Sequence, residues 1–142
     1  MESRTVSLAE SMTGGNVSAR LVEIPDASLY FKGGIVAYSD LSKVEILGVP
    51  FALINQFGVV SREVALEMAR GVRKKFHTDI ALSVTGYAGP KGENVGLVYV
   101  GIIFLDHEDC KKLRFEGKSR GEIIEEVTDW MVRQIEFLRK AP

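Results

Sequence analysis

Residues 5–15 read TVSLAESMTGG, a short apolar run followed by small and polar residues. Residues 5–9 are expected to form a buried strand that enters a turn over residues 10–15. A helix is expected to follow over about 16–23, ended by Pro25, because proline cannot continue a helix. A strand that leads through a tight turn into a helix is the repeating unit of α/β folds.

The same alternation of strands and helices continues along the chain. Further strands are expected at 34–38, 80–84, 95–105 and 111–115, and further helices at 39–46, 61–76 and 119–138. The last two strands can pair as an antiparallel hairpin, so the sheet should be mixed. We therefore expect the fold class α/β, with a three-layer α/β/α domain and a mixed, mostly parallel sheet, in a single domain over residues 1–142.

The composition is that of an ordinary globular protein and argues against nucleic acid as a partner. The chain has 142 residues, of which 46% are hydrophobic and 26% charged, and its formal net charge is −1. That length suits one domain with one core. The only dense basic cluster (Arg70, Arg73, Lys74 and Lys75) falls late in an expected helix, where cations interact favourably with the helix dipole. A solvated helix end explains this cluster, and we expect no nucleic-acid partner.

Metal, cofactor and membrane functions are not expected either. Cys110 is the only cysteine, and His77 and His107 lack metal-binding spacing, so we expect no metal site and no cofactor. No apolar run approaches the roughly 18 residues of a membrane span. Residues 1–5 carry no signal-peptide pattern, so the expected location is the cytoplasm.

Three turns of the chain are expected to meet at one edge of the sheet. In open α/β sheets ligands bind at the carboxyl ends of the strands, and the turns at Ser11, Tyr38 and Thr85 fall there. A serine just before a glycine-rich helix start lies where free main-chain N–H groups can stabilise an oxyanion. Without a histidine partner it needs another base, and a partly desolvated lysine such as Lys43 can serve. In the alternative, purely structural interpretation, Ser11 and Thr13 cap a helix and Lys43 is exposed.

Five segments of the chain carry a resemblance to a known family. They are AESMTGG (9–15), ASLYFKGGIVAYSDLSK (27–43), LGV (47–49), GVVS (58–61) and VTGYAGPKG (84–92). In order and spacing they resemble the C-terminal domain of competence/damage-inducible protein CinA, whose stand-alone versions are known as nicotinamide-nucleotide amidases. The resemblance extends over about residues 5–138.

The resemblance implies a reaction and a set of site residues. The family's reaction is hydrolysis of the amide of nicotinamide mononucleotide, which gives nicotinic acid mononucleotide and ammonia by serine chemistry without a metal. Carried over, Ser11 would be the nucleophile, Lys43 the general base and Tyr38 a hydroxyl that relays or positions the proton. The implied substrate-binding residues are Thr13, Gly14, Gly15, Thr85, Gly86, Ala88 and Gly89. The expected partner is a small-molecule nucleotide, and the expected assembly is a homo-oligomer.

Arg120 is a further expected substrate-binding residue. An arginine in the first turn of a helix opposes the helix dipole, so it favours a nearby anion. The phosphate of the substrate would be such an anion, bound by Arg120 of the same or a neighbouring subunit.

The chain departs from the family pattern at four places. The helix that usually precedes the first strand has no counterpart in the sequence, and Pro25-Asp26 replaces the usual Pro-Gly. The glycine-rich loop at 86–96 is shorter than usual, and the family's Gly-Asp-Arg matches residues 117–120 only with one residue inserted. The last two changes affect the expected substrate pocket. A catalytically silent domain that binds a nucleotide or a partner is therefore the alternative to an amidohydrolase.

Overall fold

The computed structural model describes residues 4–142. Residues 1–3, which are part of the segment 1–5 and of the expected domain over 1–142, lie outside the described part. Its five strands form one sheet in the order β2-β1-β3-β4-β5. These strands are β1 (Val6–Glu10), β2 (Phe31–Val36), β3 (Ile80–Gly86), β4 (Leu97–Phe104) and β5 (His107–Arg114).

The sheet is mixed, as expected. β1 is parallel to both of its neighbours, β2 and β3, whereas β4 is antiparallel to β3 and β5 is antiparallel to β4. Four of the five strands therefore run in the same direction, and β4 is reversed. Because β1, β2 and β3 are parallel, the turns that follow them lie at one edge of the sheet.

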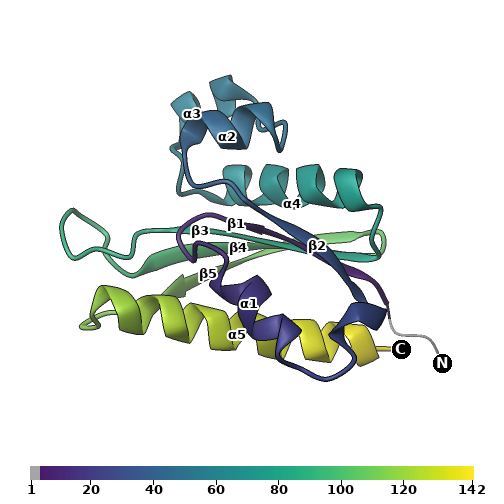
Figure 1. Ribbon diagram of the computed structural model, residues 1–142. Coiled ribbons are helices and arrows are strands. Elements are labelled where there is room, and N and C mark those ends of the chain that lie inside the picture. Colours follow the sequence, from purple (N-terminus) through teal and green to yellow (C-terminus); the bar gives the residue numbers. More distant parts are fainter. Residues whose placement is uncertain (1–3) are drawn as a thin grey trace.

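Helices cover both faces of the sheet and complete the three layers (Figure 1). They are α1 (Asn16–Val22), α2 (Asp40–Glu45), α3 (Phe51–Phe57), α4 (Arg62–Phe76) and α5 (Arg120–Lys140), with a short 3-10 helix at Ala27–Leu29. α1 and α5 lie on one face and α4 on the other, with α2 and α3 beyond α4 (Figure 1). Among the helices of residues 4–142, none combines the length and apolar character needed to cross a bilayer.

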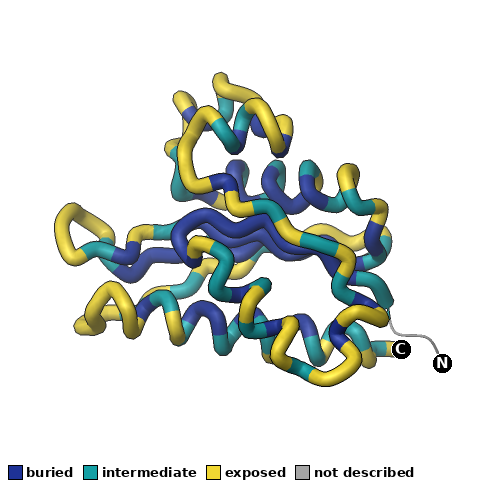
Figure 2. Tube along the Cα trace, viewed as in Figure 1, coloured by how far each residue is buried: buried dark blue, intermediate teal, exposed yellow. Residues whose placement is uncertain are grey.

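The central strands are buried on both sides, so each sheet face supports its own core (Figure 2). Leu8 of β1 belongs to the core that Val127 and Met131 of α5 complete. The next residue, Ala9, belongs to the other core, with Met68 of α4. This alternation follows from the geometry of a strand, in which successive side chains point to opposite faces.

The structure adds one helix to the expected elements and moves the start of two strands. α3 was not expected, because its seven residues are too few for a clear helical period. β2 begins at Phe31 and continues through Gly33 and Gly34, whereas the expected strand began only at the second glycine. β5 begins at His107 rather than 111, because its first residues are polar on both faces and give no alternation.

Candidate active site

A cavity of about 320 Å³ lies at the carboxyl ends of β1 and β3, large enough for a small molecule. The three expected catalytic residues, Ser11, Tyr38 and Lys43, all line it. Five expected substrate-binding residues also line it, namely Thr85, Gly86, Ala88, Gly89 and Arg120. The turns at Ser11, Tyr38 and Thr85 are therefore brought together in space, as the sheet order requires.

Ser11 and Lys43 form a buried pair in the wall of this cavity. The Nζ of Lys43 lies 2.9 Å from the Oγ of Ser11. It also donates to the carbonyl oxygens of Ala37 at 3.0 Å and Tyr38 at 3.3 Å. Lys43 is only 1% exposed and Ser11 only 7%. The alternative interpretation, in which Lys43 is exposed, is therefore wrong, and the lysine is held against the serine by two main-chain acceptors.

Burial favours the uncharged form of this lysine. Desolvation lowers the pKa of Lys43 below its usual value, and the nearby carboxylate of Asp40 opposes that shift. A neutral amine has two N–H bonds and one lone pair. If the carbonyls of Ala37 and Tyr38 accept the two N–H bonds, the lone pair faces the hydroxyl of Ser11. The arrangement suits a base that removes the serine proton.

The start of α2 explains how Lys43 reaches the cavity. Ser39 caps this helix: its Oγ accepts from the N–H of Ser42, and the side chain of Ser42 reaches back to the N–H of Ser39. The cap fixes the first turn immediately after β2. Lys43, one turn later, then points back toward the strand ends while Asp40 stays at the cavity rim.

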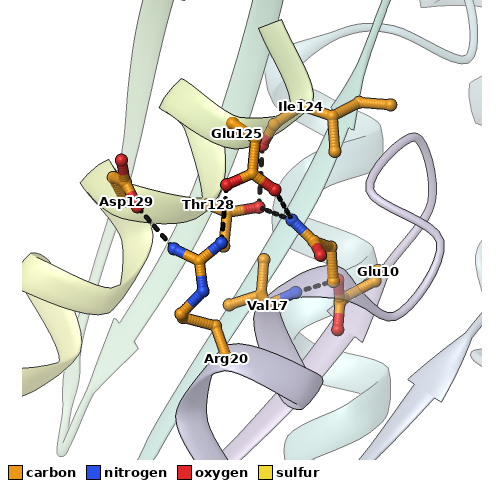
Figure 3. Close-up of polar contacts among 8 residues, drawn as sticks. Glu10, Val17, Arg20, Ile124, Glu125, Thr128 and Asp129 are labelled. Carbon is orange, nitrogen blue, oxygen red and sulfur yellow. Dashed lines mark hydrogen bonds and ion pairs between the residues drawn. The ribbon is translucent and has the colours of Figure 1, made fainter. Parts of the chain in front are cut away.

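Glu10 is a buried residue that sequence reasoning missed. One carboxylate oxygen accepts from the Thr13 hydroxyl at 2.6 Å and from the Val17 N–H at 2.9 Å (Figure 3 shows the Val17 bond). The other accepts from the N–H and the hydroxyl of Ser18 at 2.8 and 2.7 Å. Glu10 therefore supplies the acceptors for the start of α1. The alternative interpretation, in which Ser11 or Thr13 caps this helix, is wrong, and the Ser11 hydroxyl is left for Lys43.

A polar network fixes α1 against α5 (Figure 3). Arg20 of α1 donates to Glu125 at 2.6 Å and to Asp129 at 2.7 Å. Asn16 donates to Glu125 at 3.0 Å and to Thr128 at 2.8 Å. The first turns of α5 are thus placed relative to the turn that carries Ser11.

Arg120, the first residue of α5, reaches the cavity of its own chain. Its guanidinium donates to the carbonyl oxygen of Gly89 at 2.5 Å and to the hydroxyl of Tyr38 at 3.1 Å. Tyr38 is 61% exposed; its hydroxyl accepts from Arg120, and its main-chain oxygen accepts from Lys43. No neighbouring subunit is needed to supply this arginine.

Thr13, Gly14 and Gly15 do not line the cavity that holds Ser11. They face a separate surface hollow beside Gly121 of α5. The Thr13 hydroxyl is bound to Glu10, and the Gly14 N–H donates to the carbonyl of Ser11 at 3.0 Å. The turn carries the chain from the sheet edge onto the α1 face, so adjacency in sequence does not make these residues neighbours of the cavity.

Some cavity residues were not expected from the sequence. Met12 and Lys91 line it, and so does Val59. The Thr85 hydroxyl donates to the Val59 carbonyl at 3.0 Å and so holds the segment before α4 against the cavity. Lys91 lies in the quoted 84–92 motif, and its charge beside a glycine-rich turn was the available signal. Within residues 4–142, no group of three or more His, Cys, Asp or Glu side chains could hold a metal ion.

Comparison with known proteins identifies the family. A model of the CinA C-terminal domain matches residues 1–138. The chain belongs to this family. The "Putative competence-damage inducible protein" of Halothermothrix orenii is 47% identical to it over 141 residues, which cover 94% of this chain and 34% of the relative. A "CinA-like protein" of Dictyoglomus thermophilum is 44% identical over 143 residues, covering 98% of this chain and 34% of the relative.

The CinA domain thus spans about a third of the length of these curated relatives. Among solved structures, that of the competence/damage inducible protein CihA from Agrobacterium tumefaciens superposes with a TM-score of 0.91 at 32% identity. The match covers 97% of this chain and 87% of that one. The names of these CinA relatives state no reaction, so the chemistry has to be argued from the cavity.

Proposed function

We propose that this CinA domain hydrolyses the amide of nicotinamide mononucleotide to nicotinic acid mononucleotide and ammonia. The observation that carries the proposal is the buried pair of Ser11 and Lys43, with 2.9 Å between Oγ and Nζ, in the wall of a cavity of about 320 Å³. A serine activated by a neutral amine is a nucleophile suited to carbonyl groups. Both the nucleophile and its base are supplied by side chains, so we propose that the reaction needs no metal.

The reaction proceeds through an acyl-enzyme. The Oγ of Ser11 attacks the carboxamide carbon while its proton passes to the Nζ of Lys43. The carbon–nitrogen bond then breaks, and the ammonium group of Lys43 returns the proton to the departing nitrogen, which leaves as ammonia. Water next attacks the ester, giving its proton to Lys43, and the carbon–oxygen bond to Ser11 breaks. Ser11 recovers the proton, and the carboxylic acid is released.

The turn after Ser11 offers donors for the oxyanion of the tetrahedral intermediates. Among residues 4–142, no hydrogen-bond acceptor engages the main-chain N–H of Met12 or Thr13. Such N–H groups beside a nucleophile stabilise developing negative charge without having to reorganise. We assign the Met12 amide to the oxyanion, because Met12 lines the cavity whereas Thr13 faces the separate hollow beside α5.

The outer part of the cavity suits the rest of a mononucleotide. Lys91 and Arg120 line it and supply two positive charges for a phosphate. The two hydrogen bonds of Arg120 leave other N–H groups of its guanidinium for an anion. Tyr38 and Tyr87, at the same rim, offer aromatic faces to a cationic pyridine ring.

The test is release of ammonia and nicotinic acid mononucleotide from nicotinamide mononucleotide by the purified protein. Ser11→Ala should lower the rate by at least about 1,000-fold, because the nucleophile and base act as a unit. Ser28→Ala is the matched control, since Ser28 is exposed and lies outside the cavity. A chelator should leave the rate unchanged.

Two results would contradict the proposal. Full activity of Ser11→Ala would exclude this serine as the nucleophile. A nucleotide that raises the melting temperature of the wild type but is recovered intact would indicate a binding domain instead, because any ligand of the folded state stabilises it.

A further inference from the structure

Three segments that are distant in sequence meet at the guanidinium of Arg120. The arginine begins α5, Tyr38 follows β2, and Gly89 belongs to the loop after β3. One terminal nitrogen of Arg120 donates to the Gly89 carbonyl at 2.5 Å, and the other donates to the Tyr38 hydroxyl at 3.1 Å. The three residues line the cavity that holds Ser11.

Gly89 supplies one acceptor of this bridge, its carbonyl oxygen, from a tight turn. Its φ of +75° lies in the left-handed region, which favours glycine. A Cβ atom at this position would also lie 2.6 Å from the Cγ1 of Val95, so the loop is tightly packed there. The conformation of the turn therefore directs the Gly89 carbonyl toward Arg120, and the bond from Arg120 ties this turn to α5.

The main chain at Arg120 is also fixed, by interactions that do not involve the arginine side chain. The Ser119 side chain accepts from the Glu122 N–H, and the Glu122 side chain accepts from the Ser119 N–H. Ile123, one turn into the helix, is fully buried in the core. The position of the start of α5 therefore does not depend on the contacts of the guanidinium.

Tyr38 lacks comparable support. Tyr38 is 61% exposed, and within residues 4–142 its hydroxyl makes one hydrogen bond, the one donated by Arg120. An exposed aromatic side chain with one polar contact is free to change rotamer when that contact is lost. The position of the hydroxyl over the cavity therefore depends on the arginine.

We infer that Arg120 is a positioning residue that holds the Tyr38 hydroxyl and the Gly89 turn at the wall of the cavity that contains the reactive pair. This inference rests on the proposed function in one respect, since it treats the Tyr38 hydroxyl as taking part in proton transfer. It differs from phosphate binding in its kinetic effect. Removing a positioning residue lowers kcat for substrates with and without a phosphate, whereas removing a phosphate ligand affects only substrates that carry the phosphate. The planar fork of arginine can span two acceptors, and a lysine ammonium at the end of a narrow stem cannot reproduce that geometry.

The kinetic test is a double-mutant cycle with Arg120→Ala and Tyr38→Phe, assayed on nicotinamide mononucleotide and on the phosphate-free riboside. Each single variant should lower kcat about ten-fold on both substrates. The double variant should be no slower than the slower single variant, because both changes remove the same positioned hydroxyl. Arg120→Lys should keep a KM for the mononucleotide close to that of the wild type but show the lowered kcat.

The structural readout does not depend on turnover. Amide hydrogen exchange in the 86–96 loop should be faster in Arg120→Ala than in the wild type, because the loop loses its tie to α5. Arg133→Ala, at an exposed position on the same helix outside the cavity, is the control and should leave exchange and kcat unchanged. If the wild type releases no ammonia, the proposed function fails, while this measurement still tests the bridge.

Three results would overturn the inference. They are rate losses that multiply in the double variant, a riboside kcat that is unchanged in Arg120→Ala, and loop exchange that is unchanged in Arg120→Ala. The first would make the two side chains independent. The second would reduce Arg120 to a phosphate ligand. The third would show that the Gly89 turn does not need the arginine.

Discussion

Replacing Glu10 with glutamine would test how far the start of α1 depends on one buried carboxylate. Glu10 is fully buried, and its two oxygens accept four hydrogen bonds, two of them from the main-chain N–H groups of Val17 and Ser18. Glutamine keeps one oxygen and places an NH₂ group where the other was. Hydroxyl donors can rotate to accept from that group, but a main-chain N–H cannot.

The expected loss follows from this count of bonds. One main-chain N–H is left buried without an acceptor, which costs about 1–3 kcal/mol. The bonds that remain lose the assistance of a charge, which is worth about 1 kcal/mol more. We therefore expect Glu10→Gln to lower the free energy of unfolding by about 3 kcal/mol. For a chain of this length, that corresponds to a drop in Tm of about 10 °C.

Urea unfolding followed by circular dichroism measures this difference directly. Glu125→Gln is the matched control, because the Glu125 side chain is 54% exposed although it also pairs with Arg20. An exposed ion pair is worth less than about 1 kcal/mol. Equal losses in the two variants, or a loss below about 1 kcal/mol for Glu10→Gln, would refute the assignment of Glu10 as the cap of α1.

Three further predictions concern the cavity. Burial lowers the pKa of Lys43, so kcat/KM should increase with pH through that lowered pKa, as the neutral amine becomes more abundant, and then level off. A flat profile over about pH 6–9, with chemistry rate-limiting, would contradict this prediction. Gly86→Ala should reduce kcat about ten-fold and lower Tm, because the added Cβ atom would lie 2.7 Å from the Sδ of Met12. Gly121→Ala is the control, since a Cβ atom added there would have no neighbouring atom within 4 Å. Lys91→Gln should raise KM for the mononucleotide about three- to ten-fold without changing kinetics on the riboside, and equal effects on both would exclude a phosphate contact.

The parts of the site that depend on strand ends were predictable from the sequence. Ser11, Tyr38 and Thr85 each follow an apolar run that reads clearly as a strand, and parallel strands bring their ends together. Lys43 was predictable for a similar reason. Ser39 signals a helix start, and a residue one turn later lies near the same edge.

The role of Glu10 could not be read in this way. Its main-chain donors lie seven and eight residues ahead, at Val17 and Ser18, and they reach it only because the intervening turn reverses the chain. Main-chain donors are present at every position, so nothing in the side chains of 10–18 marks which donors a carboxylate will meet. The same turn removed Gly14 from the expected site, since its direction is set by left-handed glycine conformations.

The bridge from Arg120 was also beyond the reach of the sequence. Its position was expected near the phosphate, but its partners, the Tyr38 hydroxyl and the Gly89 carbonyl, belong to segments 82 and 31 residues away. Where α5 begins relative to those segments depends on the packing of Ile123 and its neighbours into the core. Tertiary packing of that kind produces no pattern in the sequence near Arg120.

The place of Arg120 in the chain also sets the order in which a newly synthesised molecule becomes competent. Ser11 and Lys43 emerge from the ribosome before α5, which follows every other element of the described fold. At ordinary rates of translation, of about 5–20 residues per second, several seconds separate the reactive pair from the arginine. During that interval the core that α5 completes lacks Ile123, Val127 and Met131, and the Tyr38 hydroxyl lacks its bond from Arg120. A nascent chain therefore carries its nucleophile and base before it has the outer wall that would orient a substrate against them.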